Sequence, residues 1–426
     1  MVEEITIKNV LSFKDEVCLS FEATTEHLYD ESHIVTMPNG MRLLRLGIVY
    51  GANASGKSNL LLALDGLCNF CLFDPKNMDD RIAIEPFLLD PHTPSQPSEY
   101  NLRFWLNGIR YWYRLIVTER QVLQEKLSFY KTVQPAMIFE RTLVDGESVI
   151  KFNQSVQKVD NDVQKAISLH CLPNMSFFAV RGHVNVKMEH VDAVREWFRT
   201  CFMPMIGPRT NMSKYGQRKI SEDIEFKDYL LNFLNMADFN IHGIVDHIEE
   251  VEDKRAKLIV DDDSYIMEIR KKETPAMKKQ HVLTFEHQVE TERGKELYEL
   301  AMEQQSAGTK RVLGVEAAVY DALKKNAFLM IDEMESSLHP RLMSYIIQRF
   351  LLERCESQLL ITTHYDGLLR SMDDLIRKDN VWFVEKDKAG VSELYSLVEF
   401  KGLHQISHFE KAYINGRFGA LPKFKD

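Results

Sequence analysis

One octapeptide has the residue types and spacing of a phosphate-binding loop. Residues 51–58, GANASGKS, match GxxxxGK[ST] at every fixed position. Glycines let a backbone wrap around phosphates, and the N–H groups at a helix N-terminus point at the anion. We expect Lys57 to reach the β- and γ-phosphates and Ser58 to bind Mg²⁺. The predicted nucleotide contacts are Gly51, Asn53, Ala54, Ser55, Gly56, Lys57, Ser58 and Asn59. The alternative is a chance match in a loop of small residues.

A second pair of residues with catalytic chemistry follows a short apolar run. Residues 327–331, AFLMI, end in Asp332 and Glu333. An aspartate at a strand end can hold the metal, and the next glutamate can polarise an attacking water. Alone, this pair is more often a solvated strand end. Together with the phosphate loop it predicts Asp332 as a metal ligand and Glu333 as a catalytic residue beside Lys57.

Apolar patterning predicts the elements that position these residues. Residues 43–50 form an apolar run before the loop, and residues 59–67 have a helical pattern after it. Alternating residues near the N-terminus predict a strand pair, and Asn107-Gly108 between two alternating runs predicts a hairpin. From about residue 297, helix and strand alternate, which is typical of a mainly parallel sheet covered by helices. The predicted class is α/β.

The distance between the two motifs indicates an inserted lobe. Ser58 and Asp332 are 332 − 58 = 274 residues apart, too far for a compact P-loop GTPase or AAA+ module. We expect residues 1–183 and 301–426 to form one head with an N-terminal antiparallel β-subdomain. Residues 184–300 are expected to form a mainly helical inserted lobe.

Two further motifs flank Asp332. Upstream, Ser306-Ala307-Gly308 opens a predicted helix, and downstream, residues 359–363 lead to His364 at a strand end. Alone, Ser306 is an ordinary helix cap and His364 an ordinary partly buried histidine. Their order relative to Asp332 favours a functional role for both.

This order of motifs resembles that of the ABC ATPases of the SMC, RecF and overcoming-lysogenization (OLD) group. The resemblance implies an ABC-type P-loop ATPase head with ATP and Mg²⁺ as cofactors. It also implies that Ser306 and Gly308 contact a nucleotide held by another subunit, so that two copies face each other. His364 is implied to sense the γ-phosphate in cis. Thr309 and Lys310 replace the last Gly and Gln of the transporter signature LSGGQ, which disfavours transport.

A narrower resemblance covers most of the chain. The segments GANASGKSNL, EQQSAGTKR, IDEMESSLHP and AYINGRFGALP are similar to those of RloA/AbiLi-type ATPases, relatives of AriA of the PARIS system. This similarity implies a nucleotide-gated oligomeric switch in bacterial anti-phage defence, acting on a separately encoded toxin or nuclease. About sixty residues follow His364 without a cluster of acids, so a built-in nuclease is not expected.

Composition limits the alternatives. Apolar residues make up 45% and charged residues 27% of 426 residues, and no run is long enough to span a membrane. The acidic N-terminal segment is unlike a signal peptide, which predicts a cytoplasmic protein. The net charge of −10 disfavours a general nucleic-acid coat, although residues 270–272 and 278–279 are basic. A RecF-like DNA-binding repair ATPase remains the alternative function.

Several smaller candidates have a plain structural interpretation. Cys68 and Cys71 form a lone CxxC that suits buried helix positions better than a metal site. Phe13 could contact adenine but is expected in the core. Residues 84–87 occupy the place of a Q-loop without a glutamine. Asp379 and the acids of residues 385–387 are expected to be solvated.

Overall fold

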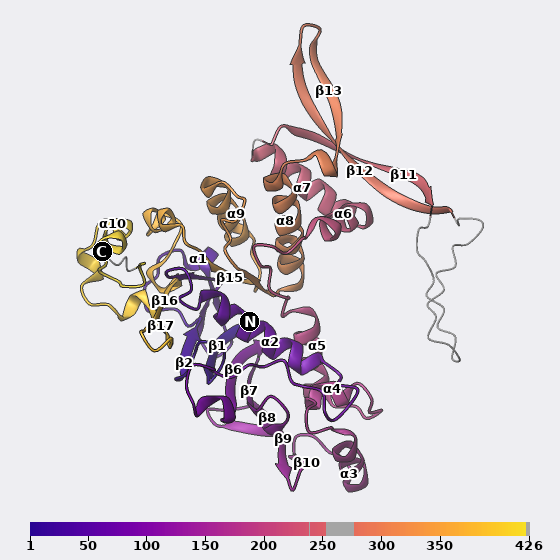
Figure 1. Cartoon of the computed structure of the whole chain (residues 1–426), viewed down its shortest axis with the longest axis vertical. Helices are drawn as coiled ribbons and strands as arrows, with labels where there is room; N and C mark the ends of the chain where they lie inside the picture. The colour runs from indigo at the N-terminus through magenta and orange to yellow at the C-terminus, as the bar shows by residue number, and fades with distance from the viewer. Residues whose placement is uncertain (238, 253–276, 423–426) are drawn as a thin grey trace. The chain divides into compact units, whose positions relative to one another are not determined.

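The computed structural model describes residues 1–237, 239–252 and 277–422 (Figure 1). The chain forms two compact units, one of Met1–Thr210 with Ala318–Asp426 and one of Asn211–Ala317. The inserted unit therefore differs at both ends from the predicted 184–300. At its start the physical reason is α5 (Glu189–Thr200), whose Trp197 and Phe198 are buried in the core of the first unit.

A five-stranded sheet of the first unit carries the phosphate loop. Its order is β14-β15-β5-β16-β17, with β5 (Leu46–Tyr50) in the centre. The other strands come from the C-terminal part of the chain: β14 (Phe328–Ile331), β15 (Gln358–Thr362), β16 (Val381–Lys386) and β17 (Ser392–Ser396). All pairs are parallel except β16–β17. Every residue of β5, β14 and β15 is buried, as their continuous apolar sequences predict.

A seven-stranded antiparallel sheet forms the N-terminal β-subdomain. Its order is β10-β9-β8-β7-β6-β1-β2. The strands are β1 (Val2–Lys8), β2 (Val17–Ser20), β6 (Ser98–Leu106), β7 (Ile109–Val117), β8 (Val122–Tyr130), β9 (Pro135–Val144) and β10 (Glu147–Phe152). Asn107 and Gly108 both have positive φ between β6 and β7, as the predicted hairpin turn requires. The predicted strand pair at the N-terminus is confirmed as β1 and β2.

Helices and aromatic side chains join the two sheets of the first unit in one core. Helix α2 (Lys57–Leu72) follows the phosphate loop and buries one side against this core. The rings of Phe104 and Trp197 stack with centroids 4.4 Å apart. The remaining elements of this unit are α1 (Asp30–His33), β3 (Ile34–Thr36), β4 (Arg42–Leu44), α3 (Asn161–His170), α4 (Phe177–Arg181), α9 (Pro340–Leu352) and α10 (Phe409–Ile414).

The second unit combines helices with a small sheet. Helices α6 (Ser213–Glu222) and α7 (Ile224–Met236) precede β11 (Ile241–Glu252), β12 (Met277–Thr291) and β13 (Gly294–Ala301). These strands form an antiparallel sheet in the order β11-β12-β13, so the unit is less helical than the sequence predicts. Helix α8 (Ala307–Lys325) begins in this unit. The basic residues 270–272, and the side chains of 278–279, lie outside the described residues.

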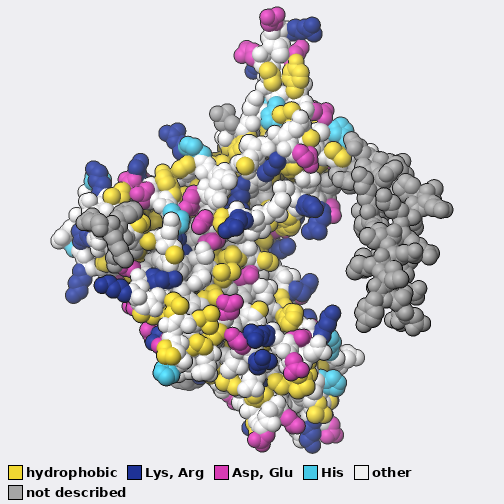
Figure 2. All heavy atoms as spheres, viewed as in Figure 1, with side chains coloured by type: hydrophobic (Ala, Val, Ile, Leu, Met, Phe, Trp, Pro, Cys, Tyr) yellow, Lys and Arg dark blue, Asp and Glu magenta, His cyan; other side chains and the backbone are white. Residues whose placement is uncertain are grey.

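The α/β class, the mainly parallel sheet and the N-terminal antiparallel subdomain are confirmed. None of the helices in the described part of the chain is long and apolar enough to cross a membrane. On the visible face of the described residues, Lys and Arg side chains are scattered among acidic ones (Figure 2).

Candidate nucleotide-binding site

The phosphate loop is shaped by two glycines that no other residue could replace without displacement. Residues 51–56 connect β5 to α2, and Gly56 is the residue before the helix with φ +118°. A Cβ at Gly56 would lie 2.4 Å from the Ser392 hydroxyl oxygen and 2.8 Å from that of Ser12. A Cβ at Gly51 would lie 2.4 Å from the backbone oxygen of Val384. The loop therefore depends on close backbone contacts with distant segments of the chain.

Lys57 bends back over the loop that precedes it. Its Nζ donates to the carbonyl oxygens of Gly51 at 2.8 Å and Ala52 at 3.0 Å, and lies 3.4 Å from His364 Nδ1. Burial lowers the pKa of Lys57 to about 8, although nearby carboxylates, including Asp332, act in the opposite direction. A phosphate group in the loop would favour the charged form of this lysine.

Ser58 and Asp332, which are 274 residues apart, are hydrogen-bonded to each other. The Ser58 hydroxyl donates to Asp332 Oδ1 at 3.1 Å. The Thr362 hydroxyl donates to the same oxygen at 2.6 Å. The backbone N–H of Asp332 donates to Ile206 O at 2.8 Å, which fixes the end of β14. A hydroxyl and a carboxylate beside a phosphate loop are the oxygen ligands that Mg²⁺ takes in such sites, so the residues present fit this ion.

Glu333 and His364 lie side by side at the ends of two neighbouring strands. Glu333 has φ +46°, and its N–H donates to the Thr362 hydroxyl oxygen at 2.8 Å. His364 Nε2 lies 3.8 Å from Glu333 Oε1. The backbone N–H of His364 donates to Glu335 Oε1 at 2.6 Å. The predicted catalytic residues Lys57, Glu333 and His364 are therefore brought together by the fold.

The remaining loop residues differ in exposure. Asn53 and Ala54 are exposed, Ser55 is buried, and Asn59 is half-buried on the first turn of α2. The Ser55 hydroxyl oxygen is buried without a hydrogen-bond partner among the described residues. A buried hydroxyl in a phosphate loop is a group that a bound anion can satisfy, which is a second sign that the loop fits a nucleotide.

Ser306 and Gly308 belong to the second compact unit, whereas the other site residues belong to the first. The Ser306 hydroxyl oxygen accepts the N–H of Thr309 at 3.0 Å, so it caps the start of α8. Ser306 is exposed and Gly308 half-buried. Their contact with a nucleotide of another subunit stays a prediction.

The structure adds residues that the sequence motifs did not single out. Thr362 orients both Asp332 and Glu333, and Glu335 holds the backbone of His364. Ser392 donates to Ser55 O at 2.6 Å and so supports the loop from β17. The role of Thr362 could have been inferred from the sequence, since this residue ends a predicted strand two residues before His364. The role of Ser392 could not, because only the fold places β17 next to the loop.

The smaller candidates have mixed outcomes. Phe13 is buried in the core of the first unit, as its core interpretation predicts. Cys68 and Cys71 are also buried there, and burial raises the pKa of Cys68 to about 12. Residues 84–87 run beside the N-terminal segment, since Leu11 N donates to Glu85 O at 2.8 Å.

The expectation that Asp379 is solvated is wrong. It is buried, and Arg377 donates to both of its carboxylate oxygens, at 2.8 and 2.7 Å. Burial acts to raise the pKa of Asp379, but the hydrogen bonds from Arg377 and Thr24 outweigh it and hold the pKa below its usual value. The charge is buried because a paired guanidinium compensates it.

Comparisons with known proteins agree with this geometry. The parallel sheet, the phosphate loop and the Ser58–Asp332 contact define an ABC-type P-loop ATPase head. A family model described as "AAA domain, putative AbiEii toxin, Type IV TA system" matches residues 48–160 and 190–370. The chain belongs to this family, whose fold implies ATPase activity in general. The family's description calls it an AAA domain. Its model nevertheless includes both Ser58 and Asp332, which are 274 residues apart in this chain.

Similar solved structures include three SMC heads, while no curated protein matches. The SMC head domain from Thermotoga maritima is 14% identical at TM-score 0.41, covering 93% of this chain and 98% of that chain. The SMC head bound to the C-terminal winged-helix domain of ScpA is 13% identical at TM-score 0.38, covering 94% and 99%. The SMC head with an extended coiled coil bound to the C-terminal domain of ScpA, from Pyrococcus furiosus, is 13% identical at TM-score 0.37, covering 93% and 97%.

Proposed function

We propose that the protein binds and hydrolyses ATP with Mg²⁺, and that hydrolysis switches an oligomer between two states. The observation that carries this proposal is the 3.1 Å hydrogen bond from Ser58 to Asp332 beside the phosphate loop. It joins the two oxygen ligands that a nucleotide-bound magnesium ion needs, from segments that only the fold brings together.

Each residue of the site has a distinct task in this proposal. The N–H groups of residues 51–58 and the ammonium of Lys57 bind the phosphates, while Ser58 and Asp332 hold the metal. Mg²⁺, when bound, neutralises charge on the phosphates. Glu333 takes a proton from the attacking water, and the N–H···O contact with Thr362 fixes its backbone. His364, which lies beside Glu333, would detect the terminal phosphate.

The switch requires two copies of the chain. Ser306 and Gly308 at the exposed start of α8 would contact the nucleotide bound by the facing copy. ATP would then favour the closed pair because it contacts both copies only in that state, and hydrolysis would release them. The N–H groups at the start of α8 would face the nucleotide's phosphates, as the N–H groups at the start of α2 do in the phosphate loop.

The biological role follows from resemblance. The similarity to RloA/AbiLi-type ATPases supports a cytoplasmic role in bacterial anti-phage defence, in which the oligomer controls a separately encoded toxin or nuclease. The family's description includes a putative toxin of a toxin–antitoxin system, which supports a link to such a system. The scattered charges on the visible face of the described residues do not favour the RecF-like DNA-binding alternative.

A complementation experiment tests the shared site. Lys57→Ala disables the phosphate loop of one copy, and Ser306→Arg blocks the surface that contacts the other. Each variant alone should lose most ATP turnover. A mixed pair has one site with both defects and one intact site, so mixing should restore part of the activity. Normal turnover by Ser306→Arg alone, or no recovery in a mixture whose subunits exchange, would refute the shared site. Full turnover by Glu333→Gln would refute the assigned base.

A further inference from the structure

Strand β13 forms one edge of the small sheet of the second unit. The order β11-β12-β13 places only β12 beside it, and Figure 1 shows the β12–β13 hairpin extending from the helices of the same unit. Among the described residues, none forms a hydrogen bond to the outer backbone groups of residues 295–299. An edge strand of this kind presents a row of N–H and C=O groups that can pair with another strand.

The side chains along this edge are exposed as well. Lys295 and Glu299 are exposed, and the exposed fractions of Leu297 and Tyr298 are 55% and 50%. Edge strands are commonly kept from pairing by a bulge, a proline or charged residues. Strand β13 contains no proline, and its register against β12 has no bulge. Its charges therefore decide which strand can pair with it.

These charges match a second copy of the same strand. In a two-fold symmetric pair the two strands run antiparallel. A register centred on Leu297 places Lys295 of each copy opposite Glu299 of the other, and Leu297 opposite itself. Opposite charges directly across a strand pair are stabilising, and like charges are destabilising. The strand is thus complementary to itself.

The other symmetric registers lack this match. Hydrogen-bonding residues alternate along a strand, so a symmetric register has a residue at its centre. Centres on Lys295, Glu296 or Glu299 place two like charges opposite each other. A centre on Tyr298 places Leu297 opposite Glu299. Within residues 295–299, charge therefore selects the register centred on Leu297.

Glu299 is held in place without being used up. Its Oε2 accepts the Thr284 hydroxyl at 2.6 Å and lies 2.9 Å from His247 Nε2. The hydrogen bonds with Thr284 and His247 hold the pKa of Glu299 below its usual value, so this side chain is charged at neutral pH. Its Oε1 takes part in neither contact, and its side chain is 45% exposed. A carboxylate has room for further donors, so Glu299 can also bind a lysine ammonium.

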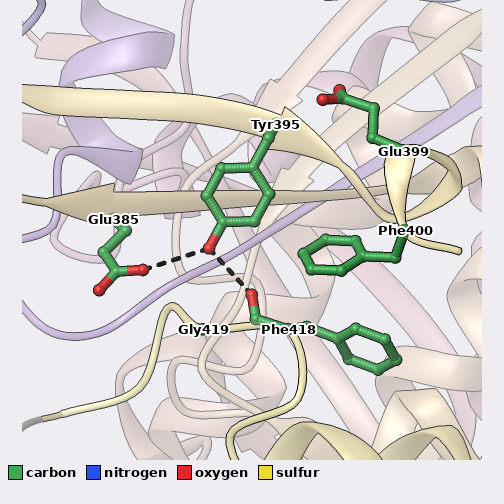
Figure 3. Close-up of a pocket in the computed structure, with 6 residues that line it drawn as sticks. All are labelled: Glu385, Tyr395, Glu399, Phe400, Phe418 and Gly419. Carbon is green, nitrogen blue, oxygen red and sulfur yellow. Dashed lines mark hydrogen bonds between the residues drawn. The ribbon is translucent and has the colours of Figure 1, made fainter.

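Candidate features of the first unit are engaged within the fold instead. A cavity of about 410 Å³ beside β17 is lined by Tyr395, whose hydroxyl donates to Phe418 O at 2.9 Å and lies 3.3 Å from Glu385 Oε2 (Figure 3). The edge strand β10 has α3 beside it, and Ile150 N donates to the Ser168 hydroxyl oxygen at 3.2 Å. Neither feature presents a row of backbone groups as β13 does.

We propose that two copies of the chain pair through β13, which joins their small sheets into one continuous sheet. Backbone hydrogen bonds supply the affinity, and the contacts between Lys295 and Glu299 fix the register. The inference goes beyond the proposed ATP-dependent pairing, because this contact needs no nucleotide. It keeps two copies together while ATP is absent.

The oligomeric state of the full, nucleotide-free chain tests the proposal by analytical ultracentrifugation. Lys295→Glu places like charges opposite each other in both contacts, so it should weaken the pair about fivefold or more. Combining Lys295→Glu with Glu299→Lys exchanges the charges and should restore the pair. Lys151→Glu, the same change at an exposed position of β10, is the control and should leave the dissociation constant unchanged.

A cross-link tests the register directly. Leu297→Cys should form a disulfide-linked dimer under mild oxidation, because the two cysteines lie directly opposite each other. Lys295→Cys should not, because in this register its two copies are offset by 299 − 295 = 4 residues, or about 13 Å along the strands. The exposed Cys18 is common to both variants and the wild type, so its background is the same.

Each of three results would overturn the proposal. One is a wild-type chain that stays monomeric without nucleotide at every concentration. Another is a dimer that Lys295→Glu does not weaken, or that the charge exchange does not restore although its melting curve matches that of the wild type. The third is equal cross-linking of Leu297→Cys and Lys295→Cys, or none by either. ATP turnover bears only on the proposed ATPase, since no nucleotide is present in these measurements.

Discussion

The hydroxyl of Thr362 donates to Asp332 Oδ1 at 2.6 Å and accepts the backbone N–H of Glu333 at 2.8 Å. One side chain of β15 thus fixes both the predicted metal ligand and the backbone of the predicted base. The register of the parallel strands, which pairs Ile331 with Ile361, makes this possible, since the two strands end together.

Thr362→Val should therefore reduce ATP turnover more than nucleotide binding. Valine keeps the shape and removes the hydroxyl, which leaves Asp332 and the Glu333 N–H without their partner. We expect turnover to fall about tenfold or more, which corresponds to about 1.4 kcal/mol. Thr362→Ser keeps the hydroxyl and is the control. Equal turnover by both variants in a steady-state phosphate-release assay would contradict this role.

Gly56→Ala should abolish nucleotide binding. Its Cβ would lie 2.4 Å from the Ser392 hydroxyl oxygen, in a backbone with φ +118°. The overlap should cost about 1–3 kcal/mol in unfolding free energy, in addition to the cost of the positive φ. Gly40→Ala is the matched control, because Gly40 has φ +86° and nothing lies within 4 Å of the place that a Cβ would take there. Thermal melts measure the loss of stability, and titration with a fluorescent ATP analogue measures the loss of nucleotide binding. Similar melting temperatures and affinities for Gly56→Ala and Gly40→Ala would contradict the steric explanation.

Nucleotide affinity should fall as pH rises through about 8, the pKa of buried Lys57. The charged lysine binds phosphate, and its protonated fraction in the free protein decreases roughly tenfold between pH 7 and pH 9. The same depressed pKa makes the nucleotide-free fold more stable with rising pH between about 8 and the usual value of 10.5, because only the unfolded chain keeps the proton there. Binding curves between pH 7 and 9.5 test the first effect. A Lys57→Arg protein stays charged, so any affinity it retains should not follow this pH profile.

Glu335→Ala should impair turnover as strongly as His364→Ala. Glu335 Oε1 accepts the backbone N–H of His364 at 2.6 Å and so positions the histidine beside Glu333. Glu335→Gln keeps an oxygen acceptor and should retain most of the rate. We expect the alanine variant to lower kcat more than it raises KM, since the phosphate contacts of Lys57 and the loop N–H groups are kept and only the position of His364 is lost. A glutamine variant as impaired as the alanine variant would show that the carboxylate charge, and not the acceptor, is required.

The sequence predicts the parts of the site that local patterns encode. The phosphate loop and Asp332 each combine a buried strand with a fixed residue type, so both can be placed without knowledge of the fold. Thr362 and Ser392 act through neighbouring strands, and their contacts depend on strand order and register. For Asp379 the sequence predicts solvent exposure, because a carboxylate near a turn is usually hydrated. Only the fold reveals that Asp379 is buried and paired with Arg377.

The domain boundary is harder to predict from the sequence than the motifs are. Helix α5 has apolar residues on one face and charged residues on the other, as many surface helices do, and this pattern does not say which unit it packs on. Trp197 and Phe198 are buried in the core of the first unit, so the insertion begins later than predicted. Strands β12 and β13 both carry exposed charged residues, which weakens the alternation of apolar and polar residues that indicates a strand. For this reason the sequence predicts a more helical lobe than the structure has.

The strand order of the five-stranded sheet has a consequence for protein synthesis. The phosphate loop follows β5, but β5 pairs with β15 and β16, which leave the ribosome more than three hundred residues later. The loop also depends on Ser392 of β17. A growing chain therefore contains the complete phosphate-loop motif long before it can have a formed nucleotide site. Because domains fold during translation from the N-terminus, the β-subdomain can form early, whereas ATP binding is acquired only when the chain is nearly finished.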